Sequence, residues 1–206
     1  MPSSVALFID GSNLYHALKQ EGKLPFNYDD LFSELSRTYQ IKQIFFYDAV
    51  KDIGRDPDGY AKQQKFHAGL KKLGWPIKLR TRKLKYIANI TQEDANSAAT
   101  QVGIVDSCRE KLWQFLQRLG LVRVTKEKGV DVLLVSDAIE QARTKQFDAI
   151  ILLSGDADFV PAINLIRTFG VKTVNLHTYS GSSTELRQAC HEHILMDFDN
   201  GGVFLR

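Results

Sequence analysis

The sequence has little cysteine. Only Cys108 and Cys190 occur in 206 residues, and they lie far apart. Neither belongs to a Cys-x-x-Cys pair or to a Cys/His spacing typical of zinc sites, which argues against a disulfide framework or a structural zinc cluster. We therefore interpret both as reduced thiols of a cytoplasmic protein.

Long hydrophobic runs and an excess of one charge are also missing. The first apolar run, Val5 to Ile9, is too short for a signal sequence or a membrane span. We expect a cytoplasmic protein with no membrane partner. The 27 Lys and Arg residues nearly balance 24 Asp and Glu, and the net charge of +3 does not by itself indicate a nucleic-acid partner.

What the sequence does contain is typical of an ordinary folded globular protein, with 44% hydrophobic and 25% charged residues. Short apolar runs alternate with longer amphipathic stretches, which predicts βα repeats around a mostly parallel sheet. The predicted strands are Val5 to Ile9, Ile41 to Tyr47, Ala149 to Leu153, Val171 to Leu176 and, at a sheet edge, Ile77 to Thr81. The predicted helices are Tyr28 to Arg37, Tyr60 to Leu73, Val105 to Leu119, Val130 to Lys145, Phe159 to Phe169 and Thr184 to Ile194. The length suits a single domain over 1–206, in which 78–124 fits the alternation least and is predicted to be an insertion.

Acidic residues follow several of the predicted strands. Asp10 ends the first, while Asp156 and Asp158 follow the strand that ends at Leu153. Asp131 begins a predicted helix. Because ligands of open α/β sheets bind outside the carboxyl ends of the strands, we expect these acids to converge at one crevice.

Carboxylates gathered in one cleft repel each other unless a cation neutralises them. Oxygen ligands without nearby His or Cys suit Mg²⁺ or Mn²⁺ rather than Zn²⁺, so we expect a metal site formed by Asp10, Asp131, Asp156 and Asp158. Helix capping is the alternative for each acid taken singly. Asp48 also follows a strand, but it precedes further acids in what reads as a solvated loop.

Three blocks in this order resemble the NYN domain, in its LabA-like bacterial branch of the PIN-like nuclease group. They are Phe8-Ile-Asp-Gly-Ser-Asn-Leu14, Lys128-Gly-Val-Asp-Val132 and Ser154-Gly-Asp-Ala-Asp-Phe159. The resemblance implies a three-layer α/β/α PIN-like domain, a family-variable character for 78–124, and a metal-dependent ribonuclease site formed by the four acids with Asn13 beside it. The family's final helix carries an Asp where this chain has His191.

Phosphodiester hydrolysis needs an activated water and neutralisation of the charge on phosphate, which metal ions supply. We expect Asp10, Asp156 and Asp158 to hold the metal, and Asp131 to act through water or to orient the nucleophile. Asn13 and Ser154 are expected to bond the phosphate, with helix capping as the alternative for Asn13.

The segment from Lys78 to Lys85 carries five basic residues and no acidic one. As a strand beside an acidic metal site it would neutralise RNA phosphates. The predicted RNA-binding residues are Arg80, Arg82, Lys83, Lys85, Lys128 and Ser154. Tyr86 and Trp75 flank the segment and could stack on bases, although a core role is the stronger interpretation. Protection of an edge strand is an equal alternative for the charges.

The sequence thus predicts a metal-dependent endoribonuclease, a hydrolase with RNA as its partner. The first alternative is an RNA-binding or regulatory module with the nuclease fold and little or no turnover. A haloacid-dehalogenase-like phosphatase is weaker, because Asp10-Gly-Ser12 lacks the second acid of that motif. A homo-oligomer is left open.

Overall fold

The computed structural model describes residues 2–54, 56–84, 90–119, 129–199 and 202–206. The chain divides into two compact units. Residues 1–82 together with 129–206 form the first, and residues 83–128 form the second. Lys85, Tyr86 and Lys128, which were predicted or considered as RNA contacts, lie outside the described residues.

The first unit is built on a seven-stranded sheet with the order β3-β2-β1-β4-β5-β6-β7. β1 pairs in parallel with β2 and β4, the pairs β4–β5 and β5–β6 are also parallel, and β7 is antiparallel to β6. The predicted mostly parallel sheet is therefore confirmed, with β3 at one edge. The strands are β1 (Ser4–Asp10), β2 (Gln40–Val50), β3 (Ile77–Lys83), β4 (Ala149–Leu153), β5 (Lys172–His177), β6 (Glu192–Asp199) and β7 (Gly202–Leu205).

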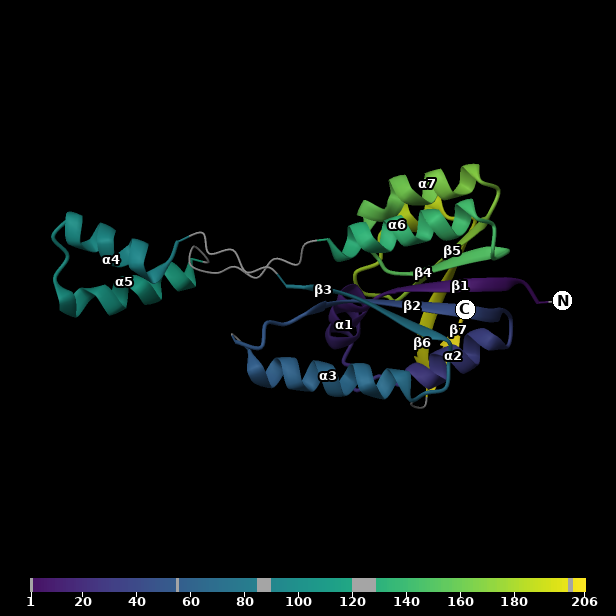
Figure 1. Ribbon diagram of the computed structural model, residues 1–206, viewed down its shortest axis with the longest axis horizontal. Helices are drawn as coiled ribbons and strands as arrows, with labels where there is room; N and C mark the ends of the chain where they lie inside the picture. The colour runs from purple at the N-terminus through teal and green to yellow at the C-terminus, as the bar shows by residue number, and fades with distance from the viewer. Residues whose placement is uncertain (1, 55, 85–89, 120–128, 200–201) are drawn as a thin grey trace. The chain divides into compact units, whose positions relative to one another are not determined.

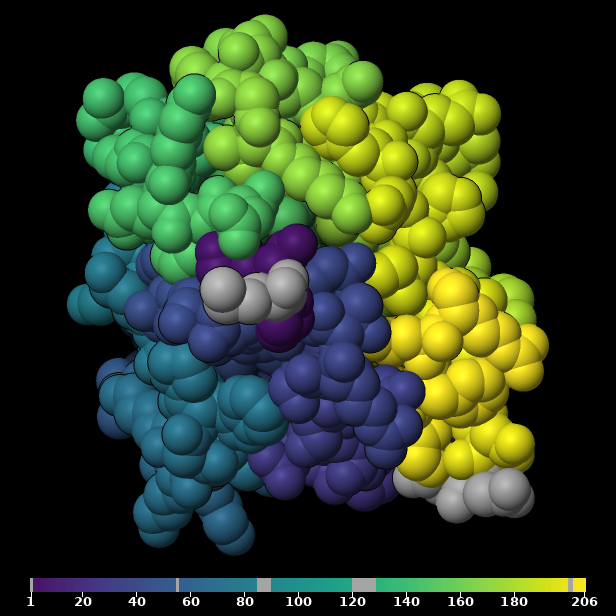
Figure 2. Space-filling view, turned by 90° about the vertical axis from the view of Figure 1, so that its right-hand side faces the viewer, coloured from purple at the N-terminus to yellow at the C-terminus, as the bar shows by residue number. Residues whose placement is uncertain are grey.

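Helices cover both faces of the sheet, which confirms the three-layer α/β/α fold. One face carries α1 (Gly11–Gln20), α2 (Tyr28–Ser36) and α3 (Pro57–Lys71), and the other carries α6 (Val130–Arg143) and α7 (Val160–Thr168) (Figure 1). A short 3-10 turn, Ala157–Phe159, precedes α7, and α8 (Thr184–Ala189) follows β5. Seen along the sheet in Figure 2, the green segment with α6 and the blue segment with α2 lie on opposite sides of the purple first strand.

The central strands are buried on both faces, which explains why they read as unbroken apolar runs. Every residue from Val5 to Ile9 is fully buried. On the side of α1 and α2, Ile9, Ile44 and Ile151 share one core cluster with Leu14 and Phe32 of those helices. This core fixes the carboxyl ends of β1, β2 and β4 beside one another.

The predicted helix from Thr184 to Ile194 is wrong in its second half. α8 ends at Ala189, and Glu192 already pairs with Val174 in the β5–β6 ladder. His191 therefore lies outside the helix, where its Nδ1 accepts a hydrogen bond of 3.0 Å from the backbone N–H of Thr173. β6 is only partly buried and so lacks the apolar run by which the central strands were recognised.

The second unit contains α4 (Gln92–Gln101) and α5 (Asp106–Arg118), which pack on each other. The predicted helix from Val105 to Leu119 is thus present as α5. A capping box joins Thr91 and Asp94 at the start of α4. The structure places the unit at 83–128 and gives the preceding residues to β3; that 78–124 varies within the family stays a prediction.

No helix in the described ranges is both long enough and apolar enough to span a bilayer.

Candidate functional site

Asp10 lies at the carboxyl end of β1 with only 5% of its surface exposed. Its Oδ1 accepts the backbone N–H of Asn13 at 3.1 Å, so Asp10 is the N-cap of α1. Its Oδ2 accepts the hydroxyl of Ser154 at 3.1 Å. The capping alternative considered for Asn13 is wrong, because Asp10 occupies that position.

The turn after β4 is tied to the start of α1. Asn13 Oδ1 accepts the backbone N–H of Gly155 at 2.9 Å, and Ser154 Oγ accepts that of Asp156 at 3.2 Å. Asp156 in turn caps the 3-10 turn by accepting the N–H of Asp158 at 2.9 Å. These bonds bring Asp10, Asn13 and Asp156 together from sequence segments more than a hundred residues apart.

Glycine at 155 is required by a close approach of backbone. A Cβ there would overlap the carbonyl oxygen of Gly181, in the loop between β5 and α8. The same loop donates the N–H of Ser183 to the Gly155 carbonyl at 2.9 Å. The turn that carries Asp156 is therefore held from both sides.

Asp131 lies in the first turn of α6, directly after the left-handed Gly129 and the buried Val130. Its carboxylate is exposed, yet its charge acts on the other acids. The pKa of Asp131 is raised, first by partial loss of solvent and then by the charges of Asp156 and Asp158.

The strongest electrostatic effect falls on Asp10. Its pKa is raised from 3.8 to about 6, mainly by burial and further by the charges of Asp131 and Asp156. The bonds from Asn13 and Ser154 lower the pKa but do not cancel the effect of burial. An acid in this environment binds either a proton or a cation more readily than an exposed acid does.

The donor set fits a hard divalent cation, because all its ligand atoms are carboxylate oxygens. Mg²⁺ uses one or two protein carboxylates and completes its shell with water and substrate oxygens. Asp10 and Asp156 would be the two protein carboxylates that such an ion requires. The described residues hold no group of three or more His, Cys, Asp or Glu side chains arranged to enclose a metal.

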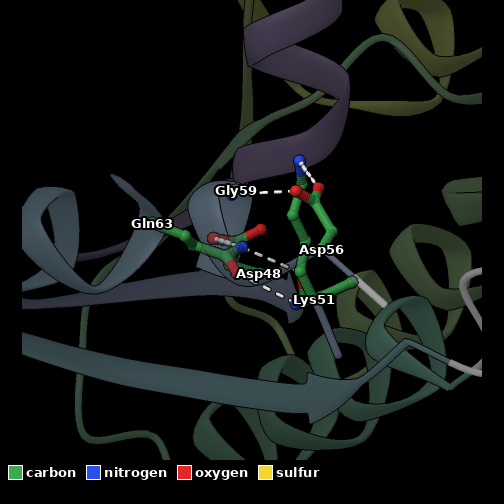
Figure 3. A network of polar contacts seen from close by, with 6 residues as sticks. Asp48, Lys51, Asp56, Gly59 and Gln63 are labelled. Carbon is green, nitrogen blue, oxygen red and sulfur yellow. Dashed lines mark hydrogen bonds and ion pairs between the residues drawn. The ribbon is translucent and has the colours of Figure 1, made fainter. Parts of the chain in front are cut away.

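Asp48 belongs to a different network, on the α3 side of the sheet (Figure 3). Its Oδ2 lies 2.7 Å from His67 Nε2 and accepts Gln63 Nε2 at 2.7 Å. Gln63 Oε1 also accepts the N–H of Lys51, whose ammonium pairs with Asp56, the N-cap of α3. Asp48 thus joins β2 to α3.

Arg80 is paired rather than presented to solvent. Its Nε and Nη2 donate to the two carboxylate oxygens of Asp137 at 2.7 and 2.8 Å. Arg82 and Lys83 are exposed. Ser154 is buried, and its hydroxyl is already bonded to Asp10. Of the predicted RNA contacts that the structure describes, Arg82 and Lys83 are therefore the two best placed to meet a ligand.

Two further polar residues, Asn175 and Asp137, join the elements around the site. Asn175 is fully buried in β5, and its Nδ2 donates to the carbonyls of Leu152 and Ser154 at 3.1 and 2.9 Å. Asn175 stands out in the sequence as an amide inside the apolar run from Val171 to Leu176. The second is Asp137, whose bond to Arg80 spans β3 and α6.

Residues 4–197 match the NYN domain. The chain belongs to the NYN domain family. It is 26% identical to the low amplitude and bright protein LabA of Synechococcus elongatus over 195 residues, which cover 94% of this chain and 83% of LabA. The LabA-like branch inferred from the three sequence blocks is thus supported.

A second relative is the uncharacterized protein y4oD of Sinorhizobium fredii. It is 37% identical over 95 residues, and the match spans 44% of this chain and 42% of y4oD, less than half of either. A crystal structure of VPA0982, a protein of unknown function from Vibrio parahaemolyticus, has the same fold. Its TM-score is 0.62 at 20% identity, over 98% of this chain and 97% of that one. The chain is thus a nuclease-fold protein of the NYN family.

Proposed function

We propose that this NYN protein is a metal-dependent endoribonuclease that hydrolyses RNA phosphodiester bonds with Mg²⁺ or Mn²⁺. The observation that carries the proposal is the electrostatic coupling of Asp10, Asp131 and Asp156 at the carboxyl edge of the sheet. The charges of Asp131 and Asp156 raise the pKa of Asp10, and the charge of Asp156 raises the pKa of Asp131, which favours a site built for a cation.

Asp10 and Asp156 would hold the cation, with Asp158 close by on the same turn. A bound divalent ion supplies charge neutralisation at phosphate and lowers the pKa of a water molecule. Asp131, exposed on α6, would orient the attacking water. The Ser154 hydroxyl donates a hydrogen bond to Asp10. Because Asn13 Oδ1 already accepts the Gly155 N–H, the Asn13 Nδ2 group would donate the hydrogen bond to phosphate.

The test is incubation of the purified chain with RNA and DNA oligonucleotides in Mg²⁺, Mn²⁺ or EDTA. We expect cleavage of RNA in either metal, none in EDTA, and loss of most activity in Asp10→Asn and Asp156→Asn. Mn²⁺ should raise the Tm of the wild type by mass action on the folded state, and Asp10→Asn should abolish the rise.

The alternative is an RNA-binding or regulatory module with the nuclease fold and little or no turnover. That alternative predicts RNA binding without cleavage in any metal. Cleavage that persists at the wild-type rate in both Asp variants would show that the active site lies elsewhere.

A further inference from the structure

Arg80, Asp137 and Tyr47 form a polar clamp between three elements of the first unit. The guanidinium of Arg80 (β3) makes the bidentate pair with Asp137 (α6). The hydroxyl of Tyr47 (β2) donates to Asp137 Oδ2 at 2.8 Å. Tyr47 is fully buried, and the Arg80 and Asp137 side chains are 31% and 19% exposed. The clamp therefore ties α6 across β2 to the edge strand.

Among the described residues, no side chain caps the start of α6. Side chains cap α1, α2 and α3, whereas α6 begins at Gly129 with no side-chain cap bond. The residues that α6 buries include Ala138 and Ala142, which are small. A small apolar cleft lined in part by Leu134, Val135 and Ala138 lies between α6, α7 and the sheet.

The position of α6 decides where Asp131 lies. Asp131 sits in the first turn of that helix, and its carboxylate acts electrostatically on Asp10 at the end of β1. β1 and β2 are paired in register, with Asp10 opposite Tyr47. A bond from Tyr47 to α6 therefore sets the helix against the strand pair that carries Asp10.

We infer that Arg80 is a positioning residue that acts through Asp137 to place Asp131 at the site, and that it is not a phosphate contact. The inference rests on the proposed nuclease function. It also revises the RNA-binding prediction for the segment from Lys78 to Lys85, because Arg80 is paired with Asp137 whereas Arg82 and Lys83 are exposed at the surface. Arg is the suitable residue, since its planar fork matches both carboxylate oxygens.

The experiment compares Arg80→Ala, Arg80→Lys and Asp137→Asn with two standards. Arg82→Ala is the standard for loss of a phosphate contact. In this variant the slope of log affinity against log salt concentration should be shallower than in the wild type by about 0.7. Lys172→Ala removes the Lys172–Glu192 pair between β5 and β6 and is the standard for loss of an ion pair away from the clamp. RNA affinity is measured in EDTA at several salt concentrations, and kcat at a temperature where each variant is fully folded.

We expect Arg80→Ala and Asp137→Asn to lower kcat about 10- to 100-fold, as is typical when a ligand's supporting partner is removed. RNA affinity and its salt slope should stay near the wild type, and Arg80→Lys should recover part of kcat. The double variant Arg80→Ala/Asp137→Asn should lose no more kcat than either single variant, because both remove one shared interaction. Lys172→Ala should leave kcat unchanged.

Two results would overturn the inference. A slope change in Arg80→Ala equal to that of Arg82→Ala, with kcat intact, would make Arg80 a phosphate contact. A wild-type kcat in folded Arg80→Ala and Asp137→Asn would show that the clamp contributes to stability and not to catalysis. If the wild type neither cleaves RNA nor responds to metal, the proposed function fails instead. Hydrogen exchange over 130–134 then tests the clamp alone, and unchanged exchange in both variants rejects it.

Discussion

Asp10 is at once a helix cap and the most perturbed acid of the site. Both oxygens accept hydrogen bonds, from the Asn13 amide and the Ser154 hydroxyl, yet burial still raises the pKa to about 6. Capping and metal binding were alternatives when the sequence alone was considered. In the structure one carboxylate fits both, since capping uses one lone pair of Oδ1 and leaves others for a cation.

The raised pKa of Asp10 makes a prediction about stability and pH. The folded state holds the Asp10 proton more tightly than the unfolded chain, so this group's contribution to stability falls as pH rises from about 4 to about 6 and is constant above that. In EDTA at pH 8, Asp10→Asn should be more stable than the wild type by up to about 3 kcal/mol. The difference should shrink toward zero near pH 4.

Urea titrations of both proteins at a series of pH values measure this difference. Comparing the pair removes the contribution of other acids, such as Asp56 and Asp148, whose pKa values are lowered and whose effect has the opposite sign. A difference that is flat with pH would mean that Asp10 titrates normally in the folded protein.

At the scale of elements, the turn after β4 depends on the loop that follows β5. Gly155→Ala places a methyl group against the backbone of Gly181, which cannot swing aside as a side chain would. We expect a loss of about 1–3 kcal/mol in unfolding free energy, as for other overpacked sites, and reduced cleavage, because Asp156 moves with the turn.

Gly69→Ala is the matched control. Gly69 lies inside α3, where a methyl group would meet no atom within 4 Å beyond the backbone of its own helix. The better helix propensity of alanine should stabilise the protein by about 0.5–1 kcal/mol with unchanged cleavage. Chemical denaturation of the two variants decides the matter, and equal stabilities would contradict the close approach at Gly155.

The elements differ in how well sequence predicts them. β1, β2, β4 and β5 were found because burial on both faces leaves an unbroken apolar signal, and the acids at their ends marked the site. β6 and β7 were missed because their residues are mostly half-buried. The Arg80–Asp137 pair was not foreseen, because 57 residues separate its partners and only the crossing of α6 over β2 brings them together.

For the whole molecule, the division into two units predicts what happens when the second unit is removed. All residues of the core cluster belong to the first unit, and none of the seven strands of the sheet includes a residue between 84 and 128. Replacing residues 84–128 by a short Gly/Ser linker should therefore leave a cooperatively folded protein, with Tm changed by less than about 5 °C.

Circular dichroism melts test this expectation, and RNA binding by the same variant separates the units' roles. Loss of a cooperative transition would show that the first unit depends on the second. A folded variant that cleaves RNA at the wild-type rate would assign the chemistry to the first unit alone.

The strand order also has a consequence for the newly made chain. β1 lies between β2 and β4, yet β4 is synthesised only after the whole second unit. Until then one edge of β1, which is apolar from Val5 to Ile9, has no partner, and an exposed edge of this kind is a template for pairing with another chain. Polypeptides that stop before Ala149 should aggregate even where β1 and β2 have paired. On the ribosome, emergence of β4 closes that edge and brings Asp156 to Asp10, so protection from aggregation and assembly of the acid cluster occur in the same step.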